Sequence, residues 1–232
     1  FANQIEAIAM ASSTDDLFER LEACGFMLRI DKTQQPSMFH FATISKGEIA
    51  QLQRLSRIIE KGHVSRIEAG NLLMQKGDNV EMPGNTLYID CTASAVDFKQ
   101  PKSRPVFESG RITIQGLRIP NPCLSAAICA YVESHYKDDE ARNRLCTPVP
   151  LPDSQQSWLT TTLGNMMNQG VWSAEPELAK WISNNRLDAF SAVIRDADLT
   201  IPENQLIMAK LGSNLMPAIS NLQKLIAADV DK

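Results

Sequence analysis

The sequence lacks any run of residues that could cross a membrane. Its longest uncharged stretch, residues 154–174, is rich in Gln, Thr and Asn, whose polar groups would have no partners in lipid. The N-terminus also lacks the basic start, apolar stretch and small-residue cleavage site of a signal peptide, yet Phe1 is not an initiator Met. We therefore expect a soluble, cytoplasmic protein, and we expect this chain to be a fragment of a longer one.

Cysteine pairs and metal-ligand clusters are also missing. The five cysteines are odd in number and form no Cys-x-x-Cys pair, which argues against a zinc site and against a closed set of disulfides. The three histidines lie far apart, so no metal site is expected. His40 lies between Phe39 and Phe41, where a buried structural histidine is the more frequent arrangement and an acid or base the functional alternative.

A strong excess of charge of one sign is absent as well. The chain has 23 basic and 27 acidic side chains, for a net charge of −4. Residues 1–137 carry 15 of each sign, whereas residues 138–232 carry 8 basic and 12 acidic ones. Because binding to phosphates requires a basic surface, nucleic acid is not an expected partner of either part.

The chain does have enough apolar residues for a core, since 44% of its 232 residues are hydrophobic. After an N-terminal helix, hydrophobic periodicity and capping residues predict further helices, one of them opened by Ser45 and Glu48 and with apolar positions reaching Ile58. The other predicted helices are 15–24, 123–136, 138–145, 154–168, 175–184, 187–196 and 213–228.

Strand patterns are confined to the first part of the chain. Residues 64–68 and 72–75 predict a hairpin around Ala69-Gly70-Asn71. Residues 87–91 predict a short buried strand, residues 111–118 predict a further strand, and residues 26–30 are also compatible with a short one. We therefore expect a mixed α/β region over residues 1–137 and an α-helical region over residues 138–232.

The order of these elements resembles half of a flavoprotein. In FAD- and NAD(P)-dependent oxidoreductases with two dinucleotide-binding domains, a hairpin like that of residues 64–77 precedes a strand that ends beside the flavin nucleotide. Here Cys91-Thr92-Ala93 occupies that place. A final strand then leads into a helix whose start points at the flavin ring, and residues 112–117 followed by Asn121-Pro122-Cys123 resemble this arrangement.

A closer resemblance is to bacterial FAD/NAD(P)-binding oxidoreductases of undefined substrate, and it covers most of the chain up to about Phe190. The segments that carry it are 15–22, 87–93, 106–108, 112–115, 125–127 and 143–150. The resemblance implies a Rossmann-like FAD/NAD(P)-binding α/β half with a β-hairpin insertion, followed by an α-helical C-terminal region. It also implies FAD and NAD(P)H as cofactors and a small molecule as substrate.

The sequence departs from that family in one motif. A Gly-x-Gly-x-x-Gly turn, which places a pyrophosphate on a helix start, does not occur in these residues. We therefore expect the adenylate-binding half to lie upstream of Phe1 in the same protein. Ala93 also stands where the family has glycine, so its methyl group restricts close approach of the backbone.

The resemblance makes Cys91, Thr92, Ala93, Asn121, Pro122 and Cys123 the candidate cofactor-binding residues. Asn121 is a good helix cap and Pro122 suits the first helical position, so free N–H groups there would favour the electron-rich edge of a flavin. The alternative is an ordinary helix start. At the level of the whole chain, the alternatives to a flavin-dependent oxidoreductase are a helical protein-interaction module without catalysis and a flavoprotein fold that has lost its cofactor.

Overall fold

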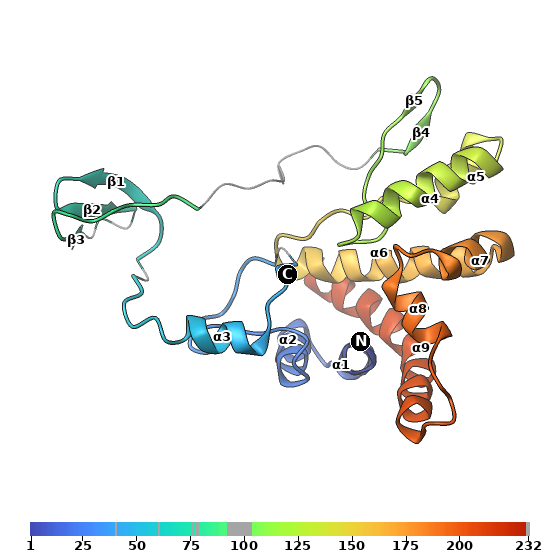
Figure 1. The fold of residues 1–232 in the computed structure, drawn as a ribbon, viewed down its shortest axis with the longest axis horizontal. Helices are drawn as coiled ribbons and strands as arrows, with labels where there is room; N and C mark the ends of the chain where they lie inside the picture. The colour runs from blue at the N-terminus through green and yellow to red at the C-terminus, as the bar shows by residue number, and fades with distance from the viewer. Residues whose placement is uncertain (40, 60, 76, 78, 92–103, 231–232) are drawn as a thin grey trace. The chain divides into compact units, whose positions relative to one another are not determined.

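The structure is a computed structural model that describes residues 1–39, 41–59, 61–75, 77, 79–91 and 104–230 (Figure 1). Contacts divide the chain into two compact units. The first combines residues 1–44 with residues 100–232, and the second comprises residues 45–99. Within the described residues, no helix is both long enough and apolar enough to span a membrane.

The second unit contains one helix and a small antiparallel sheet. Helix α3 (Lys46–Leu52) begins with the predicted capping box, in which the Ser45 hydroxyl accepts from the Glu48 N–H and the Glu48 carboxylate accepts from the Ser45 N–H. The helix ends at Leu52, so its predicted extension towards Ile58 is wrong, and Ile58 is exposed.

The predicted hairpin of the second unit is confirmed. Strands β1 (Val64–Glu68) and β2 (Asn71–Met74) pair antiparallel around Gly70, whose positive φ of 76° suits a residue without a side chain. Strand β3 (Asn79–Glu81) extends the sheet on the other side of β2.

The predicted buried strand at residues 87–91 is wrong. The segment forms no strand, and Leu87 and Ile89 are 83% and 77% exposed. Its apolar pattern is suited to a strand, but a strand also needs a partner for its backbone hydrogen bonds. Among the described residues, no strand pairs with this segment.

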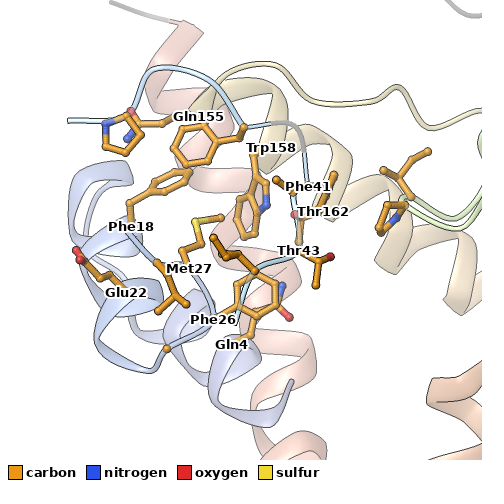
Figure 2. Close-up of a pocket in the computed structure, with 18 of the residues that line it drawn as sticks. Gln4, Phe18, Glu22, Phe26, Met27, Phe41, Thr43, Gln155, Trp158 and Thr162 are labelled. Carbon is orange, nitrogen blue, oxygen red and sulfur yellow. The ribbon is translucent and has the colours of Figure 1, made fainter. Parts of the chain in front are cut away.

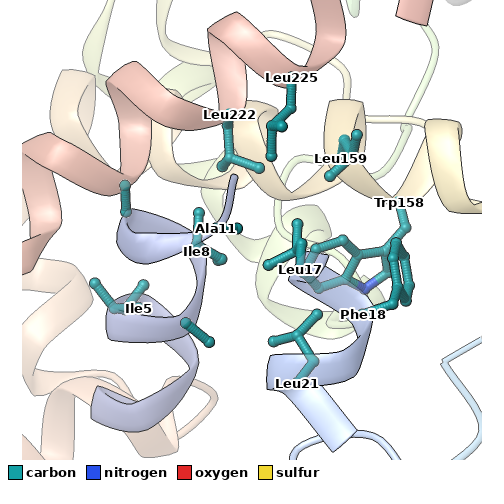
Figure 3. Close-up of a cluster of buried hydrophobic side chains, with 12 residues drawn as sticks. Ile5, Ile8, Ala11, Leu17, Phe18, Leu21, Trp158, Leu159, Leu222 and Leu225 are labelled. Carbon is teal, nitrogen blue, oxygen red and sulfur yellow. The ribbon is translucent and has the colours of Figure 1, made fainter. Parts of the chain in front are cut away.

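In the first unit, one hydrophobic cluster joins the two ends of the chain. Helices α1 (Ala2–Met10) and α2 (Thr14–Ala23) pack against the start of α6 (Gln155–Ser173) and the end of α9 (Pro202–Val230), as Figure 3 shows. Its largest buried members are Ile5, Ile8, Leu17, Phe18, Leu21, Trp158, Leu159 and Leu222. The Asn221 amide on α9 donates to the carbonyls of Ile8 and Ala11, which satisfies the end of α1.

A second cluster of the first unit lies around the other end of α6. It joins β4 (Phe107–Glu108), α4 (Pro122–His135), α5 (Asp139–Leu145) and α7 (Pro176–Asn184) to Trp172 of α6. The Trp172 indole donates to the Leu145 carbonyl at 2.8 Å. This cluster includes residues on both sides of position 137, so side chains of the first unit pack across the predicted domain boundary. The boundary itself stays a prediction.

The predicted helices after Asp138 are confirmed with small shifts at their ends, and α8 (Ala189–Arg195) falls within the range 187–196. The last helix begins at Pro202 rather than near residue 213. The predicted strands at 26–30 and 111–118 are wrong, since only β5 (Arg111–Ile112) forms, paired antiparallel with β4. The Rossmann-like fold class stays a prediction.

Candidate functional site

The predicted cofactor residues of the first unit meet at the start of α4. Asn121 is the N-cap, Pro122 is the first helical residue, and Cys123 is exposed. The Asn121 side chain accepts from the Leu124 N–H at 3.0 Å and donates to the Leu187 carbonyl at 2.7 Å. The cap predicted from the sequence is therefore confirmed, and the side chain of Asn121 is already engaged at both of its polar ends.

The backbone at this helix start has little left to offer a ligand. The Leu124 N–H is taken by the cap, the Ser125 N–H donates to the Asn121 carbonyl, and Pro122 has no N–H. Cys123 N–H is the donor that has no partner among the described residues. The start of α4 therefore offers a ligand one hydrogen bond and the positive end of the helix.

The other predicted cofactor residues are not brought to this helix start by the described structure. Cys91 belongs to the second unit, where its side chain is exposed. Thr92 and Ala93 lie outside the described residues, as does His40.

The first unit contains a cavity of about 690 Å³ that the sequence analysis missed. Figure 2 shows its walls, which come from α1, α2, the loop over residues 25–44 and the first half of α6. Arg118, Ile119 and Pro120 form a further part of the wall, immediately before the start of α4. The cavity is therefore built from segments that lie more than a hundred residues apart in the sequence.

Aromatic and thioether side chains dominate the walls. The aromatic ring centroids lie 4.8 Å apart for Phe18 and Phe39, 5.6 Å for Phe18 and Trp158, and 6.4 Å for Phe26 and Trp158. Met27, Phe41 and Met166 also line the space. These distances are those of favourable ring contacts, so one end of the cavity is a wall of packed aromatic rings.

Several polar groups of the walls have no partner. Gln4 and Thr162 are each 8% exposed and Trp158 is 1% exposed, yet none of these side chains forms a hydrogen bond to a described residue. The Nε2 atom of Gln155 is buried and likewise unpaired. Among these groups only the Nε2 atom of Gln155 is fully buried, whereas the polar atoms of Gln4, Thr162 and Trp158 keep some access to solvent. These groups can therefore form hydrogen bonds to a molecule that enters the cavity.

Three of the four charged side chains at the cavity, Glu22, Arg29 and Arg118, have polar partners, and the fourth, Glu19, is exposed. Arg29 forms an ion pair with Glu22, with a 2.8 Å hydrogen bond from Nε to Oε2, and this bond raises the pKa of Arg29. Arg118 donates to the Gln169 side chain at 3.3 Å. Burial lowers the pKa of the Arg118 guanidinium, and the Asp188 carboxylate partly offsets that effect.

Two side chains fix the backbone between the cavity and α4. The Ser125 hydroxyl of α4 accepts from the N–H groups of Leu117 and Arg118, at 3.0 and 3.1 Å. Asn165 of α6 binds the N–H and the carbonyl of Ile119, at 2.9 and 2.8 Å. These bonds replace the strand ladder predicted for this segment, and they hold Arg118–Pro120 in place as a wall of the cavity.

A pair of buried cysteines was also missed. Cys129 of α4 and Cys146 at the end of α5 both belong to the second hydrophobic cluster. The neighbouring thiol and burial both raise the pKa of Cys146, which is typical of an inert, protonated thiol. Among the described residues, no cluster of His, Cys, Asp and Glu could hold a metal ion.

Comparison with known proteins finds relatives in mycobacteria. Proteins of Mycobacterium bovis and of two strains of Mycobacterium tuberculosis, each described as uncharacterized, are 37% identical over 224 residues. The match covers 97% of this chain and 41% of each relative, so the chain spans less than half the length of the curated relatives it matches. No family model matches the chain, and no solved structure does.

Proposed function

We propose that the chain is part of a flavin-dependent oxidoreductase that uses FAD and NAD(P)H and acts on a small molecule. The proposal rests on the position of the segment Arg118–Pro120, which lies between the cavity and the start of α4. This segment lines an aromatic cavity on one side and leads directly into the capped start of α4 on the other. The resemblance to flavoproteins implies a helix start that points at the flavin ring, and a cavity beside that start would hold the substrate.

The residues of this chain would hold only one part of the cofactor. The Cys123 N–H and the positive end of α4 would hold the electron-rich edge of the flavin ring, and Ser125 and Asn165 would keep the neighbouring backbone of residues 117–119 in place. When bound, FAD supplies hydride transfer from NAD(P)H and passes two electrons to the substrate. The protein supplies position, exclusion of water and charge.

The pyrophosphate of FAD needs a different part of the whole protein. The Gly-x-Gly-x-x-Gly turn that binds it is missing from these 232 residues. More than half of each mycobacterial relative has no counterpart in this chain. We propose that the remaining part of the full-length protein provides the adenylate-binding half.

The test is a titration with FAD of residues 1–232 and, in parallel, of the full-length natural protein. We expect the full-length protein to retain FAD through gel filtration, with the visible absorption bands of a bound flavin. Residues 1–232 alone are expected to bind FAD weakly. A full-length protein that is folded but retains no flavin would contradict the proposal.

A second candidate function is a helical interaction module without catalysis, whose acidic second half binds a partner protein. The first half of α9 favours it, because Leu206 and Met216 are each 68% exposed and Ile207 is 48% exposed. Apolar side chains gathered on an exposed helix are typical of contact surfaces. Under this alternative, FAD does not bind the full-length protein, and charged substitutions at Leu206 and Met216 change its association state.

A further inference from the structure

We propose that the cavity of the first unit is a binding site for an uncharged, flat aromatic molecule that carries a carbonyl or hydroxyl oxygen. The identification of this molecule as the substrate rests on the proposed flavin function. The binding site itself is inferred from the cavity alone. The residues that line the cavity all belong to the first unit.

The walls indicate the shape of the ligand. Phe18, Phe26 and Trp158 present ring surfaces on one side of the cavity (Figure 2), and Met27 and Met166 add polarizable sulfur atoms. Aromatic rings pack favourably against other rings at the separations seen here. The volume of about 690 Å³ lies within the usual range for small-molecule sites. A fused two-ring molecule therefore fits the space and can stack on its walls.

The polar groups indicate the chemistry of the ligand. Trp158 offers only an N–H donor, whereas the amide of Gln4 and the hydroxyl of Thr162 can donate or accept. All three are at least nine-tenths buried and lack a partner among the described residues. A ligand oxygen can replace water as the partner of such a donor.

The ligand is expected to be uncharged. The three buried groups are neutral, and the positive charge of Arg29 is already paired with Glu22. Arg118 is engaged with Gln169 and lies near the charge of Asp188. An anionic ligand would lose its hydration without finding a free positive charge, which is costly. Glu19, the carboxylate of the walls that has no ion pair to a described residue, is exposed to solvent, which weakens its attraction for a cation.

The experiment is a calorimetric titration of residues 1–232 with 1-naphthol and, separately, with 1-naphthalenesulfonate. Both probes have the same fused rings, but only the second is charged. We expect saturable binding of one 1-naphthol per chain, and affinity for the sulfonate at least about tenfold weaker. Equal affinity for the two probes, or no saturable binding of 1-naphthol, would overturn the proposal.

Matched variants locate the binding in the cavity. Thr162→Val keeps the side-chain shape and Gln4→Leu keeps most of the volume, and each is expected to weaken 1-naphthol binding by about tenfold through loss of one polar contact. Thr160→Val, on the exposed face of the same helix, is the control and should leave binding unchanged.

The stability of the ligand-free variants separates binding from a structural role. Because Gln4 and Thr162 form no side-chain hydrogen bond to a described residue, Gln4→Leu and Thr162→Val are expected not to lower the melting temperature. Variants that melt earlier but bind 1-naphthol normally would contradict the inference. The 1-naphthol titration contains no FAD, so its outcome does not depend on flavin binding. If 1-naphthol binds but the full-length protein retains no FAD, only the proposed function is overturned. If the full-length protein retains FAD but 1-naphthol does not bind, only the cavity as a ligand site is overturned.

Discussion

Asn165 pairs with the backbone of Ile119 as a neighbouring strand would. Its side-chain oxygen accepts from the Ile119 N–H at 2.9 Å, and its side-chain nitrogen donates to the Ile119 carbonyl at 2.8 Å. This single side chain on α6 therefore satisfies both polar groups of a residue that lies in an irregular segment. It also fixes one wall of the cavity, because Asn165 and Ile119 both line it.

Removal of that pairing should be costly. Asn165→Leu keeps the side-chain volume but leaves the N–H and the carbonyl of Ile119 without their partner, and we expect a loss of about 3 kcal/mol in the free energy of unfolding. Urea denaturation measures this loss in the free energy of unfolding. Met167→Leu, at a half-exposed position on the same helix, is the control and should change the free energy by less than about 0.5 kcal/mol. Equal stability of the two variants would show that the pairing is not formed.

The two ends of the chain are tied by Asn221. Its amide donates to the carbonyls of Ile8 and Ala11 at 2.8 and 2.7 Å, at the end of α1. Asn221→Ala is expected to lower the free energy of unfolding by about 2 kcal/mol, since two carbonyls lose a donor. Hydrogen exchange should then increase first in α1. Protection of α1 equal to that of the wild type would contradict this role.

The cysteines are expected to differ sharply in reactivity. Cys91 and Cys123 are exposed, Cys24 is half-buried, and Cys129 and Cys146 are buried in the second hydrophobic cluster. A thiol reagent should modify Cys91 and Cys123 quickly in the folded protein, and Cys129 and Cys146 only after unfolding. Mass spectrometry of the partly modified protein locates the labels. Early labelling of Cys146 would contradict its place in the core.

Asp16 should make stability depend on pH in the acid range. Bonds from the Ser12 N–H and from Arg20 hold the pKa of Asp16 below its ordinary value of 3.8. A group with a lowered pKa in the folded state stabilises that state above its unfolded pKa, and the contribution is lost as the pH falls through the folded pKa. Asp16→Asn should therefore destabilise the protein at neutral pH, and its difference from the wild type should shrink below pH 3.8.

Urea denaturation over this pH range measures the effect of Asp16. Asp15→Asn is the matched control, because Asp15 lies in the same first turn of α2 but is not the carboxylate that Ser12 and Arg20 bind. A difference between Asp16→Asn and the wild type that stays constant down to the lowest pH would show that the charge of Asp16 does not contribute.

The helices could be predicted because their ends are set by local chemistry. The hydroxyls of Ser13 and Ser45 and the amide of Asn121 each accept from a backbone N–H three residues further on, a pattern that is visible in the sequence. The strands could not be predicted with equal success. Residues 87–91 have a strand-like composition, but the sequence does not show whether another segment pairs with them.

The cavity could not be predicted for the same reason, because distant segments build it. Gln4, Phe18 and Trp158 meet only after α1, α2 and α6 have packed together. One signal in the sequence pointed towards it. The segment 25–44 is rich in Phe and Met yet has no helical period, and apolar side chains in an irregular segment must find cover from elsewhere in the fold.

The most direct test of the central claim is reduction of the full-length natural protein, loaded with FAD, by NAD(P)H in the absence of oxygen. The account predicts that a flavin stays bound after gel filtration and that its visible absorption bleaches on addition of NADH or NADPH. Bleaching should reverse when an oxidant is added. A folded protein that retains no flavin, or a bound flavin that neither nucleotide reduces, would contradict the assignment as a flavin-dependent oxidoreductase.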